Sequence, residues 1–281
     1  MNTPATVSES SESDLAKRRL LSTKGDPFVF ADWERVLFLH FVAEPGIVKP
    51  HVPRPLELEL HEGRACLSLA AVTMRSFRPS RIGPSWFLKP LARQQFLNFR
   101  TYVRCGDEPG VLFLWGWLSQ PFGLRLPSGL RQLPYAFANI EYQHDFETGF
   151  LRGVVAAHGD SSHRFSYRAR IELNAAFQPC LPGSLAEFAM ERCTGYFGHR
   201  NGVRRFRAWH PPWSQSPIQA AIEEDSLVTE KFPWFAQAEL AGANFAPGFE
   251  RVWLGRAHTV TSSNAAQRDR GGVLGAFYEL P

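Results

Sequence analysis

The sequence predicts a β-rich α+β fold in which antiparallel strands dominate and a few helices are inserted. Aromatic residues make up 13% of the 281 residues, and there are 22 Gly and 21 Pro. Aromatic side chains suit the pleated surface of a sheet, and Gly and Pro mark the turns between short strands. Strand-like apolar runs also recur on either side of short turn segments, which is the pattern of hairpins.

The first strands are expected in the N-terminal half. The apolar run Trp33–Val42 predicts a buried strand. Leu56–His61 alternates apolar and polar residues and turns into the apolar stretch Ala65–Met74, so we expect a hairpin there. A second hairpin is expected to join residues 96–104 to residues 111–118.

The C-terminal half predicts further strands and one well-marked helix. The strand-like runs are 136–142, 150–157, 163–173, 203–209 and 249–256. Ser184 is a residue type that favours the N-cap of a helix, and Glu187 follows three residues later, as in a capping box. A helix is therefore expected over residues 185–193.

Residues 26–260 are expected to form one domain, and the segments before and after it show no clear pattern of helices or strands. Residues 1–25 are polar and almost free of large apolar side chains, which predicts a disordered tail, and residues 261–281 form a C-terminal extension. The Pro-interrupted segment 78–93 predicts a long loop at the mouth of a cavity. No apolar stretch approaches the roughly 18 residues of a membrane helix, and no secretory signal pattern is present, so we expect a cytoplasmic protein.

Several functional classes are disfavoured. The four cysteines are widely spaced, and no motif for zinc, phosphate or dinucleotide binding occurs, so we expect neither a metal nor a cofactor. The formal net charge is +4, and the arginines are scattered apart from the cluster Arg204, Arg205 and Arg207. A nucleic-acid-binding surface usually has a denser basic stripe, so nucleic acid ranks below a small molecule as partner. A homo-oligomer is compatible with the sequence.

The predicted strand that includes Asn98 has an unusual set of polar side chains. With the two-residue period of a strand, Asn98, Arg100 and Tyr102 share one face. An amide, a guanidinium and a phenol suit the wall of a polar cavity. A solvated outer face of the sheet explains them equally well.

Two further segments contain candidate binding residues. Arg131 and Tyr135 flank a Gln-Leu-Pro segment, and an arginine at the mouth of a cavity could bind a carboxylate through two hydrogen bonds, although a solvated loop arginine is the simpler interpretation. In His210-Pro-Pro-Trp213, two prolines fix the backbone between an imidazole and an indole. Trp213 fits a core position better than a ligand contact, whereas His210 fits both equally.

Six motifs occur in an order that resembles the YqjF-like bacterial family. They are Trp33–Phe41, Val52–Leu58, Leu97–Val103, Leu133–Tyr135, Gly183–Arg192 and His210–Trp213. This family is similar in fold to acetoacetate decarboxylase. The resemblance therefore implies a curved antiparallel sheet that forms a cone-like barrel around a central cavity.

The resemblance also bears on the chemistry. Acetoacetate decarboxylase forms a Schiff base through a lysine just before a short Leu-Gly-Tyr-Pro segment, and Arg131 stands near that position here. Arginine stays protonated in proteins and cannot form this imine. Members of the YqjF-like family often have a Glu just before the motif that begins at Leu97, whereas this chain has Phe96. The first difference argues against a Schiff-base mechanism, and the second removes a possible acid or base and weakens the case for an enzyme.

The sequence thus favours a cavity protein that binds a small organic acid. The candidate residues are Arg100, Arg131, Asn98 and Trp213 for ligand binding, and Tyr102, Tyr135 and His210 for catalysis. An enzyme of this kind would be a lyase similar to the decarboxylases but without the Schiff-base lysine. The alternatives are a non-catalytic ligand sensor or storage module and, ranked third, a basic nucleic-acid-associated protein.

Overall fold

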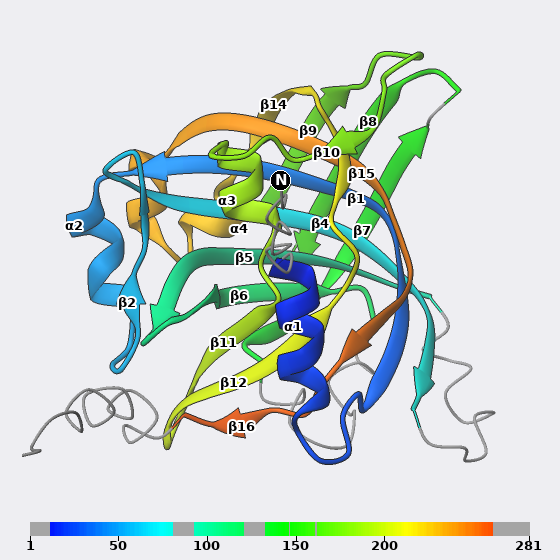
Figure 1. Ribbon diagram of the computed structural model, residues 1–281. Coiled ribbons are helices and arrows are strands. Elements are labelled where there is room, and N and C mark those ends of the chain that lie inside the picture. The colour runs from blue at the N-terminus through cyan, green and yellow to red at the C-terminus, as the bar shows by residue number, and fades with distance from the viewer. Residues whose placement is uncertain (1–11, 81–92, 121–132, 146, 161, 261–281) are drawn as a thin grey trace, which may run out of the picture.

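The computed structural model describes residues 12–80, 93–120, 133–145, 147–160 and 162–260 (Figure 1). This part of the chain is rich in strands and has few helices. The helical segments are α1 (Glu12–Leu21), α2 (Pro45–Val48), α3 (Leu185–Met190), α4 (Ser226–Thr229), and the 3-10 turns η1 (Lys49–His51) and η5 (Pro233–Gln237). Within the described ranges, none of the helices has both the length and the apolar character needed to cross a membrane.

The strands differ greatly in length. The longer ones are β1 (Val29–Ala43), β4 (Arg64–Pro79), β5 (Arg93–Cys105), β6 (Glu108–Leu118), β7 (Tyr135–Asp145), β8 (Phe150–Ala157), β9 (Arg164–Arg170), β12 (Gly202–Trp209) and β15 (Glu239–Leu254). The shorter ones are β2 (Glu57–Leu58), β3 (Leu60–His61), β10 (Gln178–Pro179), β11 (Thr194–His199), β13 (Ser214–Pro217), β14 (Gln219–Glu224) and β16 (His258–Thr259).

Antiparallel pairs dominate the sheet, as expected, but the sheet is mixed, because two of the pairings of β6 are parallel. Strand β6 pairs antiparallel with β5, but it pairs in parallel with β11 near Val111 and with β7 near Gly116. Parallel neighbours need long connections, so a pattern that compares successive strands does not reveal them. Following the pairings from β6 through β11, β12, β15, β1, β4 and β5 leads back to β6.

Most of the predicted elements are present, although several ends differ. The hairpins β3–β4 and β5–β6 form as expected. Helix α3 follows the N-cap Ser184, whose hydroxyl accepts a hydrogen bond from the Glu187 backbone N–H at 3.2 Å. The helix ends at Met190 rather than at residue 193, and strand β15 begins at Glu239 rather than at residue 249.

Residues 12–21 form helix α1, so the prediction of a disordered tail is wrong for this segment. Leu20 is fully buried, and Lys17 Nζ lies 4.5 Å from the centroid of the Trp209 ring. The Ser13 hydroxyl donates a hydrogen bond to the carbonyl oxygen of His210 at 3.0 Å and accepts one from Trp209 Nε1 at 3.1 Å. These contacts hold α1 beside β12 (Figure 1), and the composition of the tail does not reveal them.

The two faces of strand β5 meet different parts of the protein interior, because successive side chains of a strand point to opposite faces. Leu97 and Phe99 are fully buried in the largest apolar cluster of the described residues. Asn98 and Arg100 belong to the other face, where they line a pocket. The outer-face interpretation of these two polar residues is therefore incorrect.

Candidate functional site

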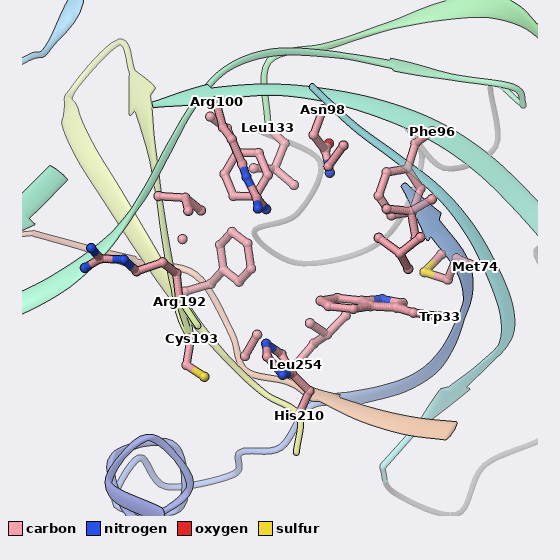
Figure 2. A pocket seen from close by; sticks show the side chains of 18 of the residues that line it. Trp33, Met74, Phe96, Asn98, Arg100, Leu133, Arg192, Cys193, His210 and Leu254 are labelled. Atoms are coloured by element: carbon pink, nitrogen blue, oxygen red, sulfur yellow. The ribbon is translucent and has the colours of Figure 1, made fainter. Parts of the chain in front are cut away.

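A pocket of about 150 Å³ lies on the Asn98 face of β5. Strands β1, β4, β5, β6, β12 and β15 contribute to its walls. Most of the lining side chains are apolar, among them Phe38, Val72, Met74, Phe96, Phe206 and Leu254. Figure 2 shows three polar side chains, Asn98, Arg100 and His210, directed into this space.

Arg100 brings a positive charge into these apolar surroundings. One of its terminal nitrogens, Nη2, donates a hydrogen bond to the carbonyl oxygen of Ala189 at 3.2 Å. Its Nε is buried and has no hydrogen-bond partner in the described part of the chain. The guanidinium carbon lies 5.0 Å from the centroid of the Phe38 ring.

No carboxylate among the described residues forms an ion pair with Arg100. The internal segments 81–92 and 121–132, which lie outside the described residues, contain no Asp or Glu. Removing a cation from water is costly unless an anion accompanies it. Arg100 is therefore well suited to bind an anionic group of a ligand.

Arg192 provides an internal comparison, because it lies in the same wall and has a partner. Its Nη1 lies 2.8 Å from Glu59 Oε2, and its Nε donates a hydrogen bond to the carbonyl oxygen of Phe188 at 2.7 Å. In Figure 2 the Arg192 guanidinium points away from the centre of the pocket. The charge of Arg192 is thus balanced by Glu59, whereas Arg100 has no carboxylate partner among the described residues.

Asn98 and Tyr135 form a polar pair at the edge of the pocket. Tyr135 Oη donates a hydrogen bond to Asn98 Oδ1 at 2.5 Å. Burial raises the pKa of Tyr135 well above its ordinary value, although the charge of Arg100 acts in the opposite direction. The phenol is therefore protonated at neutral pH, and it orients the Asn98 amide.

The Tyr135 ring occupies space that only a glycine on β6 leaves free. A Cβ on Gly116 would lie 1.8 Å from Tyr135 Cε1, far inside van der Waals contact. An isolated glycine in an apolar strand often marks such a close approach. That signal is present in the sequence and would have pointed to Gly116 as a residue that shapes the site.

His210 enters the pocket from the segment after β12. Its Nδ1 lies 2.7 Å from the carbonyl oxygen of Pro211, and because a carbonyl oxygen only accepts, Nδ1 bears the proton. Burial, with a further contribution from the charge of Arg100, lowers the pKa of His210 to about 4. The imidazole is therefore neutral at pH 7, and its Nε2 is a hydrogen-bond acceptor.

Trp213 combines the two roles that the sequence left open. It is 2% exposed, and its Nε1 donates a hydrogen bond to the carbonyl oxygen of Met190 at 2.8 Å, as expected of a core residue. It also lines the pocket together with Trp33, and the two ring centroids lie 6.1 Å apart with nearly parallel planes. The ring centroids of Trp213 and Phe38 lie 5.2 Å apart in an edge-to-face arrangement.

Tyr102 is buried outside the pocket, which argues against its predicted catalytic role. Its hydroxyl lies 2.5 Å from Ser68 Oγ, which lies 2.8 Å from Nδ1 of the buried His40. The Tyr102 ring centroid is 5.9 Å from the guanidinium carbon of Arg100. Tyr102 thus packs beside Arg100 without facing the space that a ligand would fill.

Arg131 lies outside the described residues, as does most of the 78–93 loop. Their predicted positions at the site and at the cavity mouth stay predictions. Within the described ranges, no group of three or more His, Cys, Asp or Glu side chains could hold a metal ion.

The arginine cluster on β12 is largely used inside the protein. Arg205 Nη1 lies 2.6 Å from Glu108 Oε2, and Arg207 Nε lies 2.8 Å from Glu108 Oε1. Arg204 donates a hydrogen bond to the carbonyl oxygen of Ala257 at 2.6 Å. Burial acts to raise the pKa of Glu108, but its hydrogen bond with Arg207 and the two positive charges lower that pKa below its ordinary value. The cluster is therefore poor support for nucleic-acid binding.

Comparison with known proteins gives the fold and the family. A sequence relative, "Uncharacterized protein YqjF" of Bacillus subtilis (strain 168), is 26% identical over 197 residues, which are 70% of this chain and 78% of the relative. An acetoacetate decarboxylase-like enzyme from Sphingomonas wittichii RW1 has a similar structure, with a TM-score of 0.57, 15% identity, and coverage of 84% of this chain and 94% of that chain.

A second solved structure with this fold is the enduracididine biosynthesis enzyme MppR complexed with pyruvate. Its TM-score is 0.57 at 13% identity, with coverage of 84% of this chain and 92% of that chain. At these identities the structural likeness establishes the acetoacetate decarboxylase-like fold alone. Residues 31–248 match the family model DUF2071, described as "Uncharacterized conserved protein", and this chain is a member of that family.

Proposed function

We propose that this protein binds a small organic acid in the pocket and that Arg100 binds the carboxylate. The observation that carries the proposal is a guanidinium in an apolar pocket with a backbone carbonyl as hydrogen-bond partner and no carboxylate partner among the described residues. A carboxylate would satisfy the charge and accept two parallel hydrogen bonds from an arginine. The pyruvate complex of MppR concerns a distant relative in fold, and it supports the proposal as an example of an acid bound in such a fold.

The proposal also covers the shape of the sheet around the pocket and the roles of the other residues near Arg100. The ring of strand pairings is interpreted as a cone-like barrel around a central cavity. Arg131 is proposed as a second contact to the anion. Asn98 and Trp213 contact the ligand from the wall, and Tyr135 and His210 are the candidates for proton transfer.

The chemistry of these groups favours non-covalent action over a Schiff base. No lysine is among the described residues that line the pocket, and Lys89 belongs to the segment 81–92. Tyr135 is a hydrogen-bond donor, and neutral His210 is an acceptor or base. An enzyme built on this site would be a decarboxylase-like lyase that stabilises developing charge with fixed donors. A sensor or storage module with the same pocket is the second candidate, since both need the same binding geometry.

A thermal-shift screen of small carboxylates tests the proposal. We expect at least one acid to raise the melting temperature of the wild-type protein and to have no effect on Arg100→Gln. Arg75→Gln is the matched control, because Arg75 lies on the neighbouring strand β4 and pairs with Glu34 outside the pocket. A stabilising acid that acts equally on wild type and Arg100→Gln would contradict the proposal.

Nuclear magnetic resonance then separates the two candidates. Each stabilising acid is incubated with the protein, and its spectrum is followed over several hours. Conversion that is abolished in His210→Gln supports an enzyme. If the spectrum stays unchanged at a protein concentration that binds nearly all of the acid, the result supports the sensor or storage module.

A further inference from the structure

We infer that the preferred ligand is an aryl monocarboxylic acid, with one carboxylate and one six-membered aromatic ring. This inference rests on the proposed function, because it takes Arg100 as the carboxylate site, and it adds the chemical class of the acid. Three properties of the pocket lead to it: the number of unbalanced charges, the nature of the wall and the volume.

The charges of the described wall favour one carboxylate over two. Arg100 has no carboxylate partner among the described residues, whereas Arg192 is paired with Glu59 at 2.8 Å. His210 is neutral at pH 7. A second carboxylate on the ligand would therefore lie against apolar side chains, and such a burial is strongly unfavourable.

The wall opposite Arg100 is built from aromatic rings. In Figure 2 the Trp33 indole and His210 lie across the pocket from the Arg100 guanidinium. Trp33 and Trp213 lie with nearly parallel planes, and Phe38, which lies beside Arg100, extends this aromatic surface because it meets Trp213 edge to face. Aromatic rings interact favourably with another ring in offset or edge-to-face contact, so a ring on the ligand finds suitable partners here.

The volume of the pocket matches a single ring. It is about 150 Å³, the size of an engineered apolar protein cavity that takes up benzene. Acetate or pyruvate would fill only part of this space and would leave apolar wall uncovered. Because burial of apolar area drives binding, an acid that fills the space gains affinity over one that does not.

Calorimetric titration of the wild-type protein with a series of ligands tests the inference. The titrations are done at pH 7.5, about one unit above the ordinary pKa of histidine, where His210 is neutral. We expect benzoate or phenylacetate to bind at least tenfold more tightly than acetate and pyruvate. Malonate, a dicarboxylate, should give no measurable heat. Benzamide and phenylacetamide, which have the same shape without the charge, should bind at least tenfold more weakly than the matching acids.

A variant that fills the pocket gives an independent readout. Ala208 lines the pocket from β12, and Ala208→Leu would reduce the room for a ring without altering Arg100. We expect benzoate affinity to fall at least tenfold in this variant while acetate affinity stays within twofold. Ala221→Leu, on an exposed position of β14, is the control that should change neither. The wild-type ligand series tests the inference without this variant if Ala208→Leu does not fold.

The outcomes separate this inference from the function on which it rests. Acetate or pyruvate binding as tightly as the aryl acids, with loss in Arg100→Gln, would overturn the aryl class and leave the acid-binding function standing. Equal affinity for benzoate and benzamide would overturn both, because the ring would then bind without help from Arg100. Absence of binding by every acid would overturn the acid-binding function itself.

Discussion

Arg100 on β5 and His210 after β12 line the same pocket, and the charge of Arg100 adds to burial in lowering the pKa of His210 to about 4. At neutral pH the described pocket wall therefore combines one positive charge without a carboxylate partner with a neutral imidazole. The pair is suited to a ligand whose anionic end faces Arg100 and whose remaining part lies near His210. A protonated His210 would instead place two cations in one apolar space.

Gly116→Ala should damage the site without changing a residue that contacts the ligand. The new Cβ would lie 1.8 Å from Tyr135 Cε1, so the ring must move and its hydrogen bond with Asn98 must break. We expect a loss of about 1–3 kcal/mol in the free energy of unfolding and at least tenfold weaker acid binding, measured by urea unfolding and calorimetry. Gly198→Ala on β11, where nothing lies within 4 Å of the new Cβ, should keep both properties.

The protein should lose stability as the pH falls from about 6.5 to 4. The pKa of His40 is lowered to about 3, and the pKa values of His144 and His210 are lowered to about 4, in each case mainly by burial. The unfolded chain, with histidine pKa values of about 6.5, therefore binds more protons than the folded protein in this range. The neutral forms of these three histidines therefore contribute fully to the free energy of unfolding above pH 6.5, and this contribution is lost as the pH falls toward 4.

The contribution of His210 to this acid sensitivity can be isolated. A histidine that is protonated in the unfolded chain but not in the folded protein adds about 1.4 kcal/mol per pH unit to the slope of unfolding free energy against pH. The slope of unfolding free energy against pH, measured between pH 6 and 5 by urea unfolding, should be lower in His210→Gln by about that amount. An identical slope in wild type and variant would show that the folded protein protonates His210 as readily as the unfolded chain.

Glu108→Gln should destabilise the protein by about 3 kcal/mol at pH 7, because two partly buried guanidinium groups would lose their shared, buried anion. Arg205 and Arg207 both pair with this carboxylate. Since the pKa of Glu108 is lowered in the folded state, its contribution is full above its ordinary pKa and is lost as the pH falls through the folded value. The difference between wild type and variant should therefore shrink at acid pH, and a constant difference from pH 7 to 3 would contradict this account.

Leu20→Ala tests whether α1 is part of the folded domain. Leu20 is fully buried, whereas the adjacent Leu21 is 50% exposed. Removing the buried side chain should cost about 2–5 kcal/mol, and Leu21→Ala should cost no more than about 0.5 kcal/mol. Equal, small effects of both substitutions on urea unfolding would restore the interpretation of residues 12–21 as a disordered tail.

The strands that pair locally could be predicted from the sequence, and those that depend on distant partners could not. Hairpin β5–β6 has apolar runs on both sides of a turn, so its pattern is contained in one segment. Strand β14 instead pairs with β9, and its residues alternate between half-buried and exposed with Ile222 as the single large apolar side chain. Its strand conformation is fixed by the partner, which the local pattern does not contain.

The polar part of the site was easier to predict than its apolar wall. Asn98 and Arg100 stand out because polar side chains on an apolar strand need a partner or a cavity, and His210 stands out because two prolines fix the backbone beside it. Trp33 and Phe96 line the same pocket, but in the sequence they are indistinguishable from ordinary core residues. Tyr102 shared the period of Arg100 yet lies outside the pocket, because periodicity gives the face of a strand and not the extent of a cavity along it.

The most direct test of the central claim is a crystal structure of the protein grown with benzoate, in which electron density locates the carboxylate. The account predicts both carboxylate oxygens at about 2.7–2.9 Å from the terminal nitrogens of Arg100, with the ring lying against Trp33 and Trp213. A ring that faces Arg100 while the carboxylate lies elsewhere, or benzoate bound outside this pocket, would contradict the claim that Arg100 is the anion-binding residue.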